Sequence, residues 1–232
     1  MRLCSRIALI FSALFWAAVA VAAPPQQVAA VAPASTPPAL AAHPCRVIVA
    51  GFRGAIEDPN DRSSGVVSIR NRLRSLRHAD LCARVFSPYH QGRALKWILA
   101  QFHLNLSATP SEEEVAREPK VILYGYSLGG WAMMAVARHL GKENVPVQLG
   151  VVVDATWPAS KTVPPNVREA ANFYQRKSWL MRGRDHIRAQ DSELTQIVVN
   201  ERLDRPGHFS IDLAPQVSDF IVAQAESFYA PE

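Results

Sequence analysis

One serine stands where it could act as a nucleophile. Ser127 is the central residue of Gly125-Tyr126-Ser127-Leu128-Gly129, which fits the pattern G-x-S-x-G. The strand-like run KVILYGY leads into it, and the helical pattern GGWAMMAVARHLG follows. A serine at such a joint occupies a sharp turn that lifts its hydroxyl above the sheet, and the flanking positions are too crowded for side chains. The alternative is a serine that only caps the helix.

A serine hydroxyl is a poor nucleophile at neutral pH and needs a base that accepts its proton. Among the seven histidines, His208 lies in RPGHFSID, after the last strand candidate and before the last helical pattern. This is the carboxyl end of a strand, and in a parallel sheet it is the same edge as Ser127. His90, after the second strand candidate, and His186, before the last one, are competitors. We predict that His208 is the base.

The base in turn needs a carboxylate that fixes its tautomer and stabilises the imidazolium. Asp154 ends the run GVVVD, at the carboxyl end of the fourth strand candidate, and gives the chain order Ser, Asp, His. Its competitors are Asp185, Asp191 and Asp204. An acid after the next strand along would favour Asp185 or Asp191, but neither stands at a clean strand end. We therefore predict Asp154 as the acid.

Acyl transfer at a serine also needs backbone N–H donors for the oxyanion of the tetrahedral intermediate. Leu128, directly after the nucleophile, is predicted to supply one donor. The loop after the first strand candidate, AGFRG, should supply the other, with Phe52 as the first choice and Arg53 as the second. Candidates for lining a substrate pocket are Arg53, Tyr126 and Trp157.

These side chains need a scaffold that brings them to one edge. Strand-like and helix-like segments alternate along residues 45–232, which is typical of an α/β fold with a mostly parallel sheet. We expect about six strands flanked by helices and no large cap domain. The strand candidates are CRVIVAGFRG, ARVFSPY, KVILYGY, VQLGVVVDA, VREAANFYQR and LTQIVVNER. The helix candidates are VVSIRNRLRSLRH, GRALKWILAQFHL, GGWAMMAVARHLG with Gly141 as its stop, and APQVSDFIVAQAESFY.

The first residues have the pattern of a secretory signal peptide. Arg2 and Arg6 precede an apolar run that ends in the small residues Ala20-Val21-Ala22. Residues 1–22 are therefore predicted to be removed on export to the periplasm or the medium, with an uncleaved membrane anchor as the alternative. Residues 23–44 are rich in Pro and Ala and read as a linker. After cleavage we expect no stable membrane insertion.

The cysteines agree with an exported protein. Cys4 would leave with the signal peptide, and the pair Cys45 and Cys82 would remain. Each of the two precedes or begins an apolar run. If those runs are neighbouring parallel strands, both thiols lie at the same sheet edge and a disulfide is geometrically plausible. The alternative is two buried free thiols.

The charge of the chain does not call for a nucleic-acid partner. The net charge is +5, and without Arg2 and Arg6 it falls to +3, with 23 basic and 20 acidic residues. The arginines of SIRNRLRSLRH surround Ile69, Leu73 and Leu76, which repeat at helical spacing. This pattern favours the solvated basic face of a helix over an anion-binding patch.

Taken together, VIVAGFRG, GYSLGGWA, VVVDA and GHFSID resemble the α/β-hydrolase superfamily, over about residues 45–230. Ala50 stands where that family usually has a histidine outside the triad. The resemblance implies Ser127 as nucleophile, His208 as base and Asp154 as acid, with no metal and no organic cofactor. The chain is short for the family and most resembles small bacterial lipase/esterase- or thioesterase-like members.

The expected activity is hydrolysis of carboxylic esters, including lipid or acyl esters, by an exported serine hydrolase with a small-molecule substrate. Thioester or amide hydrolysis on the same triad is an alternative, because the fold does not fix the substrate. A non-catalytic binding module of the envelope and a membrane-tethered interaction protein are others. The nearby aromatic residues could build an acyl pocket or pack the core: Phe52, Tyr126, Trp131 and Trp157. The sequence leaves the oligomeric state open.

Overall fold

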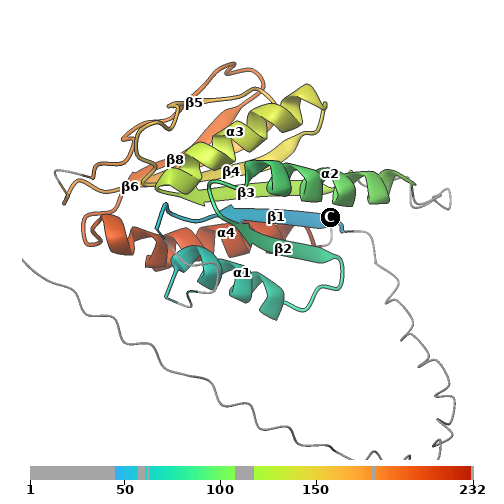
Figure 1. Ribbon diagram of the computed structural model, residues 1–232, viewed down its shortest axis with the longest axis horizontal. Helices are drawn as coiled ribbons and strands as arrows, with labels where there is room; N and C mark the ends of the chain where they lie inside the picture. Colours follow the sequence, from blue (N-terminus) through green and yellow to red (C-terminus); the bar gives the residue numbers. More distant parts are fainter. Residues whose placement is uncertain (1–44, 57–60, 62, 108–117, 179–180, 231–232) are drawn as a thin grey trace, which may run out of the picture. The chain divides into compact units, whose positions relative to one another are not determined.

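The long strands of the chain form one parallel sheet. The computed structural model describes residues 45–56, 61, 63–107, 118–178 and 181–230. Six strands pair in the order β2-β1-β3-β4-β6-β8 (Figure 1), and every neighbouring pair is parallel. They are β1 (Val47–Phe52), β2 (Leu81–Phe86), β3 (Lys120–Tyr126), β4 (Val147–Val153), β6 (Val167–Tyr174) and β8 (Gln196–Arg202). The predicted α/β fold with a sheet of about six strands is confirmed.

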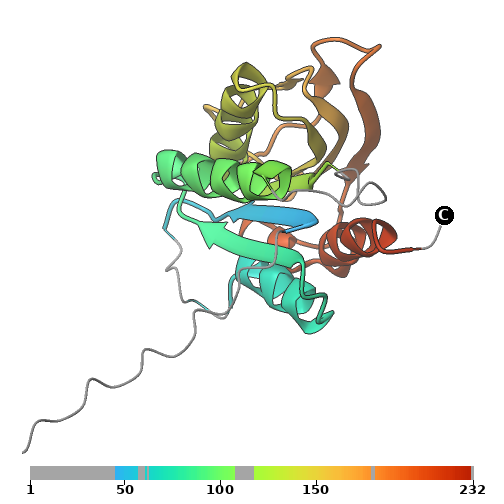
Figure 2. The same cartoon turned by 90° about the vertical axis from the view of Figure 1, so that its right-hand side faces the viewer.

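Helices cover both faces of this sheet (Figures 1 and 2). Helices α2 (Gln91–Ser107) and α3 (Leu128–Lys142) pack on one face, where their apolar residues join the first core. Helices α1 (Gly65–Ser75) and α4 (Pro215–Ser227) pack on the other face and form the second core. Each of the four helices lies within one of the amphipathic patterns in the sequence or extends it by a few residues.

The inner strands are apolar because both of their faces are covered. Along β1, Ile48 packs into the first core and Val49 into the second. All six residues of this strand are buried. Strand β8, at one edge of the sheet, instead alternates between exposed and half-buried residues and carries polar side chains. Full burial of central parallel strands and a polar edge are what the physics of such sheets requires.

Three local features differ from the sequence prediction. Gly141 does not end helix α3, which runs on to Lys142, so that prediction is wrong. The residue with positive φ after the helix is Asn144, at 55°. A small two-stranded sheet of β5 (Thr162–Val163) and β7 (Arg188–Ala189), and the 3₁₀ helix η1 (His208–Leu213), were not expected. These short pieces carry too few residues to show a hydrophobic period.

Cys45 and Cys82 form a disulfide, with 5.7 Å between their Cα atoms. Cys45 directly precedes the segment that leads into β1, and Cys82 is the second residue of β2, where it pairs in register with Ile48. The bond therefore joins the two strands near their amino ends. The expected disulfide is confirmed.

The described residues all belong to one compact unit, Ala41–Glu232. Among them, no helix combines the length and the apolar character that crossing a membrane requires. The expected signal peptide, residues 1–22, and the expected linker, residues 23–44, lie outside the described residues. Both remain predictions.

Candidate active site

Ser127 sits in a strained turn between β3 and α3. Its φ of 54° and ψ of −122° lie outside the regions that a residue with a side chain prefers. A Cβ at Gly125 would overlap the backbone of Gly129, and a Cβ at Gly129 would overlap the carbonyl oxygen of Phe52. The glycines on both sides of the serine are therefore required by space. Figure 1 shows strand β3 and helix α3, which this turn connects.

The serine hydroxyl contacts a histidine rather than the helix that follows it. Ser127 makes no side-chain capping hydrogen bond to α3. Its Oγ lies 3.0 Å from Nε2 of His208, and Nδ1 of His208 lies 2.7 Å from Oδ2 of Asp154. The exposed fractions of the three residues are 6%, 2% and 0%. Ser127, His208 and Asp154 thus form a continuous, buried hydrogen-bonded chain, with Oγ at one end.

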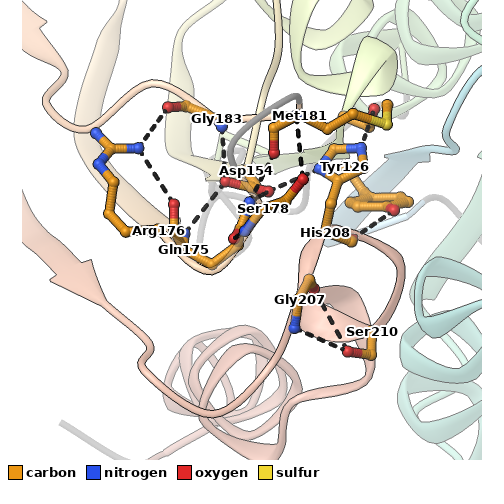
Figure 3. A network of polar contacts seen from close by, with 11 residues as sticks. Tyr126, Asp154, Gln175, Arg176, Ser178, Met181, Gly183, Gly207, His208 and Ser210 are labelled. Carbon is orange, nitrogen blue, oxygen red and sulfur yellow. Dashed lines mark hydrogen bonds and ion pairs between the residues drawn. The ribbon is translucent and has the colours of Figure 1, made fainter.

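The carboxylate of Asp154 is held by three further donors (Figure 3). Oδ1 accepts hydrogen bonds from the backbone N–H groups of Gln175, at 3.2 Å, and Gly183, at 3.0 Å. Oδ2 accepts one from Nε2 of Gln175, at 2.9 Å, besides its contact with His208. Several hydrogen bonds of this kind fix the orientation of a buried carboxylate. Asp154 is therefore presented to the imidazole in one position.

Gln175 is itself locked in place. Its Nε2 also donates to the carbonyl oxygen of Met181, at 2.7 Å, and its Oε1 accepts from the N–H of Ser178, at 2.8 Å. The side chain is fully buried. Gly183 can approach Asp154 only because it lacks a side chain, since a Cβ there would overlap Oδ1 of the carboxylate. Both residues come from the loop after β6, which wraps around the acid.

The histidine is anchored through its backbone. The hydroxyl of Tyr126 donates to the carbonyl oxygen of His208 at 2.7 Å. His208 begins η1, and Asp212 in the same helix accepts a hydrogen bond from the N–H of Gly65, at 2.7 Å, at the start of α1. The base is thus tied both to the residue before the nucleophile and to a helix on the opposite face of the sheet. Tyr126 thus has a positioning contact, and its expected role in a substrate pocket remains a prediction.

The competing carboxylates have other partners. Asp185 accepts a hydrogen bond from Lys161 at 2.7 Å and pairs with Arg176 at 3.1 Å. The hydrogen bond from Lys161 is the largest cause that holds the pKa of this carboxyl well below its ordinary value. Asp204 pairs with Arg202 at 2.7 Å, and Asp191 accepts from the N–H of Glu193 at 2.9 Å. The carboxylate that the structure brings to His208 is Asp154.

The competing histidines also lie elsewhere. His186 has an exposed side chain beside Asp185, with 3.8 Å between Nδ1 and the nearer carboxylate oxygen. His90 lies in the turn before α2, where its N–H bonds to the carbonyl oxygen of Ser87. Among the described residues, no three or more His, Cys, Asp or Glu side chains are grouped so as to hold a metal ion.

The expected oxyanion donors lie on two segments in close contact. Leu128 is the first residue of α3, and Phe52 is the last residue of β1. The carbonyl oxygen of Phe52 lies close to Gly129, the residue after Leu128. The N–H of Arg53, the second choice, donates to the carbonyl oxygen of Phe86 at 3.1 Å, and Phe52 is itself paired in the sheet with Phe86 of β2 and Gly125 of β3. Leu128 and Phe52, with Arg53 as the second choice, remain predictions.

The aromatic and basic residues expected near a pocket have different surroundings. The side chain of Phe52 is fully buried in the first core, and half-buried Trp131 packs against the same core. For these two, the core-packing alternative holds. Trp157 has an exposed fraction of 81%, whereas Arg53 is buried. A pocket role for Arg53 and Trp157 remains a prediction.

Sequence reasoning missed the residues that hold the acid. Gln175 directly follows a buried strand, at the edge where Asp154 and His208 were sought, so the same rule would have found it. Gly183 lies in the irregular segment after β6, and nothing in the sequence separates it from the other glycines of the chain. Its role follows only from its distance to Asp154.

The sheet of parallel strands, the strained serine between β3 and α3, and a histidine after the last strand are features of the α/β-hydrolase fold, which this chain has. A scan of protein-family models finds none that matches, and a search of curated proteins finds no match either.

Solved structures that resemble the chain are distant in sequence. The RedJ thioesterase of prodiginine biosynthesis in Streptomyces coelicolor is 9% identical, with a TM-score of 0.46 over 78% of this chain and 90% of that one. ClbQ of the colibactin pathway is 11% identical, with a TM-score of 0.47 over 79% and 98%. An alpha/beta-superfamily hydrolase of Xanthomonas campestris pv. campestris is 14% identical, with 0.48 over 79% and 99%.

Proposed function

We propose that the protein is a serine hydrolase that cleaves carboxylic esters through an acyl-enzyme on Ser127. The observation that carries this proposal is the buried chain from Oγ of Ser127 through His208 to Asp154, with distances of 3.0 Å and 2.7 Å. A strained backbone at the nucleophile is costly and persists at functional sites, because the surroundings enforce it. A serine that served only packing would need neither feature.

The arrangement supports a two-step reaction. Oγ of Ser127 attacks the acyl carbon while Nε2 of His208 takes its proton, and Leu128 and Phe52 donate N–H groups to the oxyanion. The bond to the alcohol then breaks, and His208 gives its proton to the leaving oxygen. In the second step His208 takes a proton from water, whose oxygen attacks the acyl carbon, and Ser127 leaves with that proton. Asp154 stabilises the imidazolium in both steps.

We also propose that the protein is exported. The disulfide Cys45–Cys82 supports this, because such bonds persist in oxidising compartments and are rare in reducing ones. The apolar run after Arg2 and Arg6 supports it independently. The intact mass of the protein recovered from cells should lack residues 1–22. A recovered chain that kept them would support a tethered protein instead.

The first test is labelling of the mature protein with a fluorophosphonate, followed by peptide mass spectrometry. We expect covalent label on Ser127 and none on a Ser127→Ala variant. A panel of esters, thioesters and amides then ranks the substrates by kcat/KM. A folded protein that took no label would contradict the proposal and would favour a non-catalytic binding module.

The acid is tested by Asp154→Asn. We expect kcat to fall by about four orders of magnitude, because the histidine loses the partner that fixes its tautomer. Asp204→Asn is the matched control, since Asp204 pairs with Arg202 on the surface. Equal activity of the two variants would remove Asp154 from the mechanism.

A further inference from the structure

Most of the large exposed apolar side chains of the described residues lie in segments at the edge of the sheet that holds Ser127. Among the described residues, seven large hydrophobic side chains are exposed. Five of the seven lie in segments that follow the carboxyl ends of strands. They are Ile56 after β1, Tyr89 after β2, Trp157 after β4, and Phe209 and Leu213 after β8. Single exposed hydrophobic residues are ordinary, but their concentration at one functional edge is not.

These side chains project outward. Trp157 is 81% exposed and Phe209 is 71% exposed, and the two come from different loops. Phe209 directly follows the base, and its ring meets the ring of His208 edge-on, with 5.3 Å between the centroids. The projecting aromatic group is therefore attached to the segment that carries the catalytic histidine.

The same edge carries a cluster of basic side chains. The loop after β4 and the loop after β6 contain five cations among their described residues: Lys161, Arg176, Lys177, Arg182 and Arg184. Besides the buried Asp154, their only described acidic residue is Asp185. Most of this cluster surrounds an open hollow of about 330 Å³. Asp185 pairs with Lys161 and Arg176, so the hollow keeps a positive excess.

We infer that this edge docks on the surface of an anionic lipid membrane. Trp157 and Phe209 would enter the headgroup region, where aromatic rings are favoured, and the cations of the hollow would face lipid phosphates. As far as it concerns catalysis, the inference rests on the proposed function, since docking would bring Ser127 to esters held in the membrane. The docking itself needs no turnover.

A lipid surface fits the edge better than a folded protein partner does. Protein interfaces have a packed apolar centre with charged residues depleted from it. Here the apolar groups come from four separate segments, and the basic cluster lies on loops at the same edge of the sheet. Separate projecting aromatic groups beside basic residues are the arrangement that proteins use to bind membranes peripherally.

The test is sedimentation with lipid vesicles, using the mature Ser127→Ala protein so that lipids are not consumed. We expect binding to phosphatidylglycerol vesicles, weaker binding to pure phosphatidylcholine vesicles, and a decrease as salt is raised. The double substitution Trp157→Ser with Phe209→Ser should lower the affinity at least about tenfold. Arg182→Gln should weaken binding to the anionic vesicles only. Thermal unfolding checks that each variant is folded.

Leu194→Ser is the matched control. Leu194 is 58% exposed but precedes β8, at the amino end of that strand. Its substitution should leave vesicle binding unchanged. Equal losses of vesicle binding from Leu194→Ser and from the aromatic substitutions would overturn the inference. A folded protein that binds no vesicles would also overturn it and would favour a protein partner for this edge. Fluorophosphonate labelling of the wild type is scored separately, so failure of docking and failure of the proposed function are distinguishable.

Discussion

At the scale of single residues, the site depends on two backbones held in unusual conformations. Ser127 and Asp154 both have positive φ, 54° and 44°, although neither is a glycine. Such conformations cost about 1–3 kcal/mol each and need surroundings that enforce them. For Asp154 those surroundings are the donors of the loop after β6. The position of Asp154 therefore depends on the conformation of that loop.

Gln175→Ala tests the side-chain part of this support. The variant loses the bond from Nε2 to Oδ2 of Asp154 but keeps both backbone donors. A hydrogen bond to a charged group contributes about 1.5–3 kcal/mol, so we expect kcat to fall by about 10- to 100-fold. KM should stay the same, because Gln175 reaches the substrate only through Asp154 and His208. A raised KM with unchanged kcat would contradict this positioning role.

Gly183→Ala tests the backbone part. The new Cβ would overlap Oδ1 of Asp154, so the loop must shift and the acid must lose a donor. We expect the rate of fluorophosphonate labelling to fall by more than about tenfold, in line with the loss of a hydrogen bond to a charged group. Gly207→Ala is the control, since a Cβ there meets no atom within 4 Å and its φ of −89° suits alanine. Similar labelling rates for the two variants would show that the contact is dispensable.

At the scale of elements, the loops after β4 and β6 are joined by charge. Asp185 accepts a hydrogen bond from Lys161 of one loop and pairs with Arg176 of the other. Its pKa is lowered, first by the hydrogen bond from Lys161, so the carboxylate is more easily ionised in the folded than in the unfolded chain. The stabilisation is present above the unfolded pKa and is lost as the pH falls through the folded one.

The pH dependence of stability checks this pairing. We expect wild type to be more stable than Asp185→Asn at neutral pH, and the difference to shrink as the pH falls below the ordinary value of 3.8. Denaturant unfolding at several pH values measures it. The side chains are about half exposed, so added salt should reduce the difference. A difference that stayed constant down to the lowest pH would rule out a contribution from the ionised pair.

The six strands and the four helices could be predicted because each carries a hydrophobic run or period along its own sequence. The serine, the histidine and the first-choice acid followed from one rule, that chemistry gathers at the carboxyl ends of parallel strands. Gln175 obeys that rule, but a polar residue after a strand is common. Gly183 and the exposure of Trp157 depend on how loops fold over the sheet, for which the local sequence holds no period.

At the scale of the whole molecule, the disulfide joins two neighbouring strands across 37 residues of chain. Replacing both cysteines by serine should lower the free energy of unfolding by about 4 kcal/mol, because the unfolded chain regains the entropy of that loop. Urea unfolding of the oxidised wild type and the double variant measures the loss. Equal midpoints and equal slopes would show that the bond contributes nothing to stability.

The disulfide lies far from the catalytic residues, so the protein's resistance to proteolysis and its turnover rate depend on different parts of the fold. It lies near the amino end of β1, and the six residues of that strand, about 20 Å in length, separate it from the carboxyl edge that bears Ser127. A reductant should therefore make the protein more susceptible to proteolysis. The molecules that remain intact should keep their turnover rate. Turnover divided by the number of active sites, counted by fluorophosphonate labelling of parallel samples during proteolysis in reducing buffer, should stay constant while that number falls. Redox conditions would then determine the lifetime of the protein, and the carboxyl edge that bears Ser127 would determine its turnover rate.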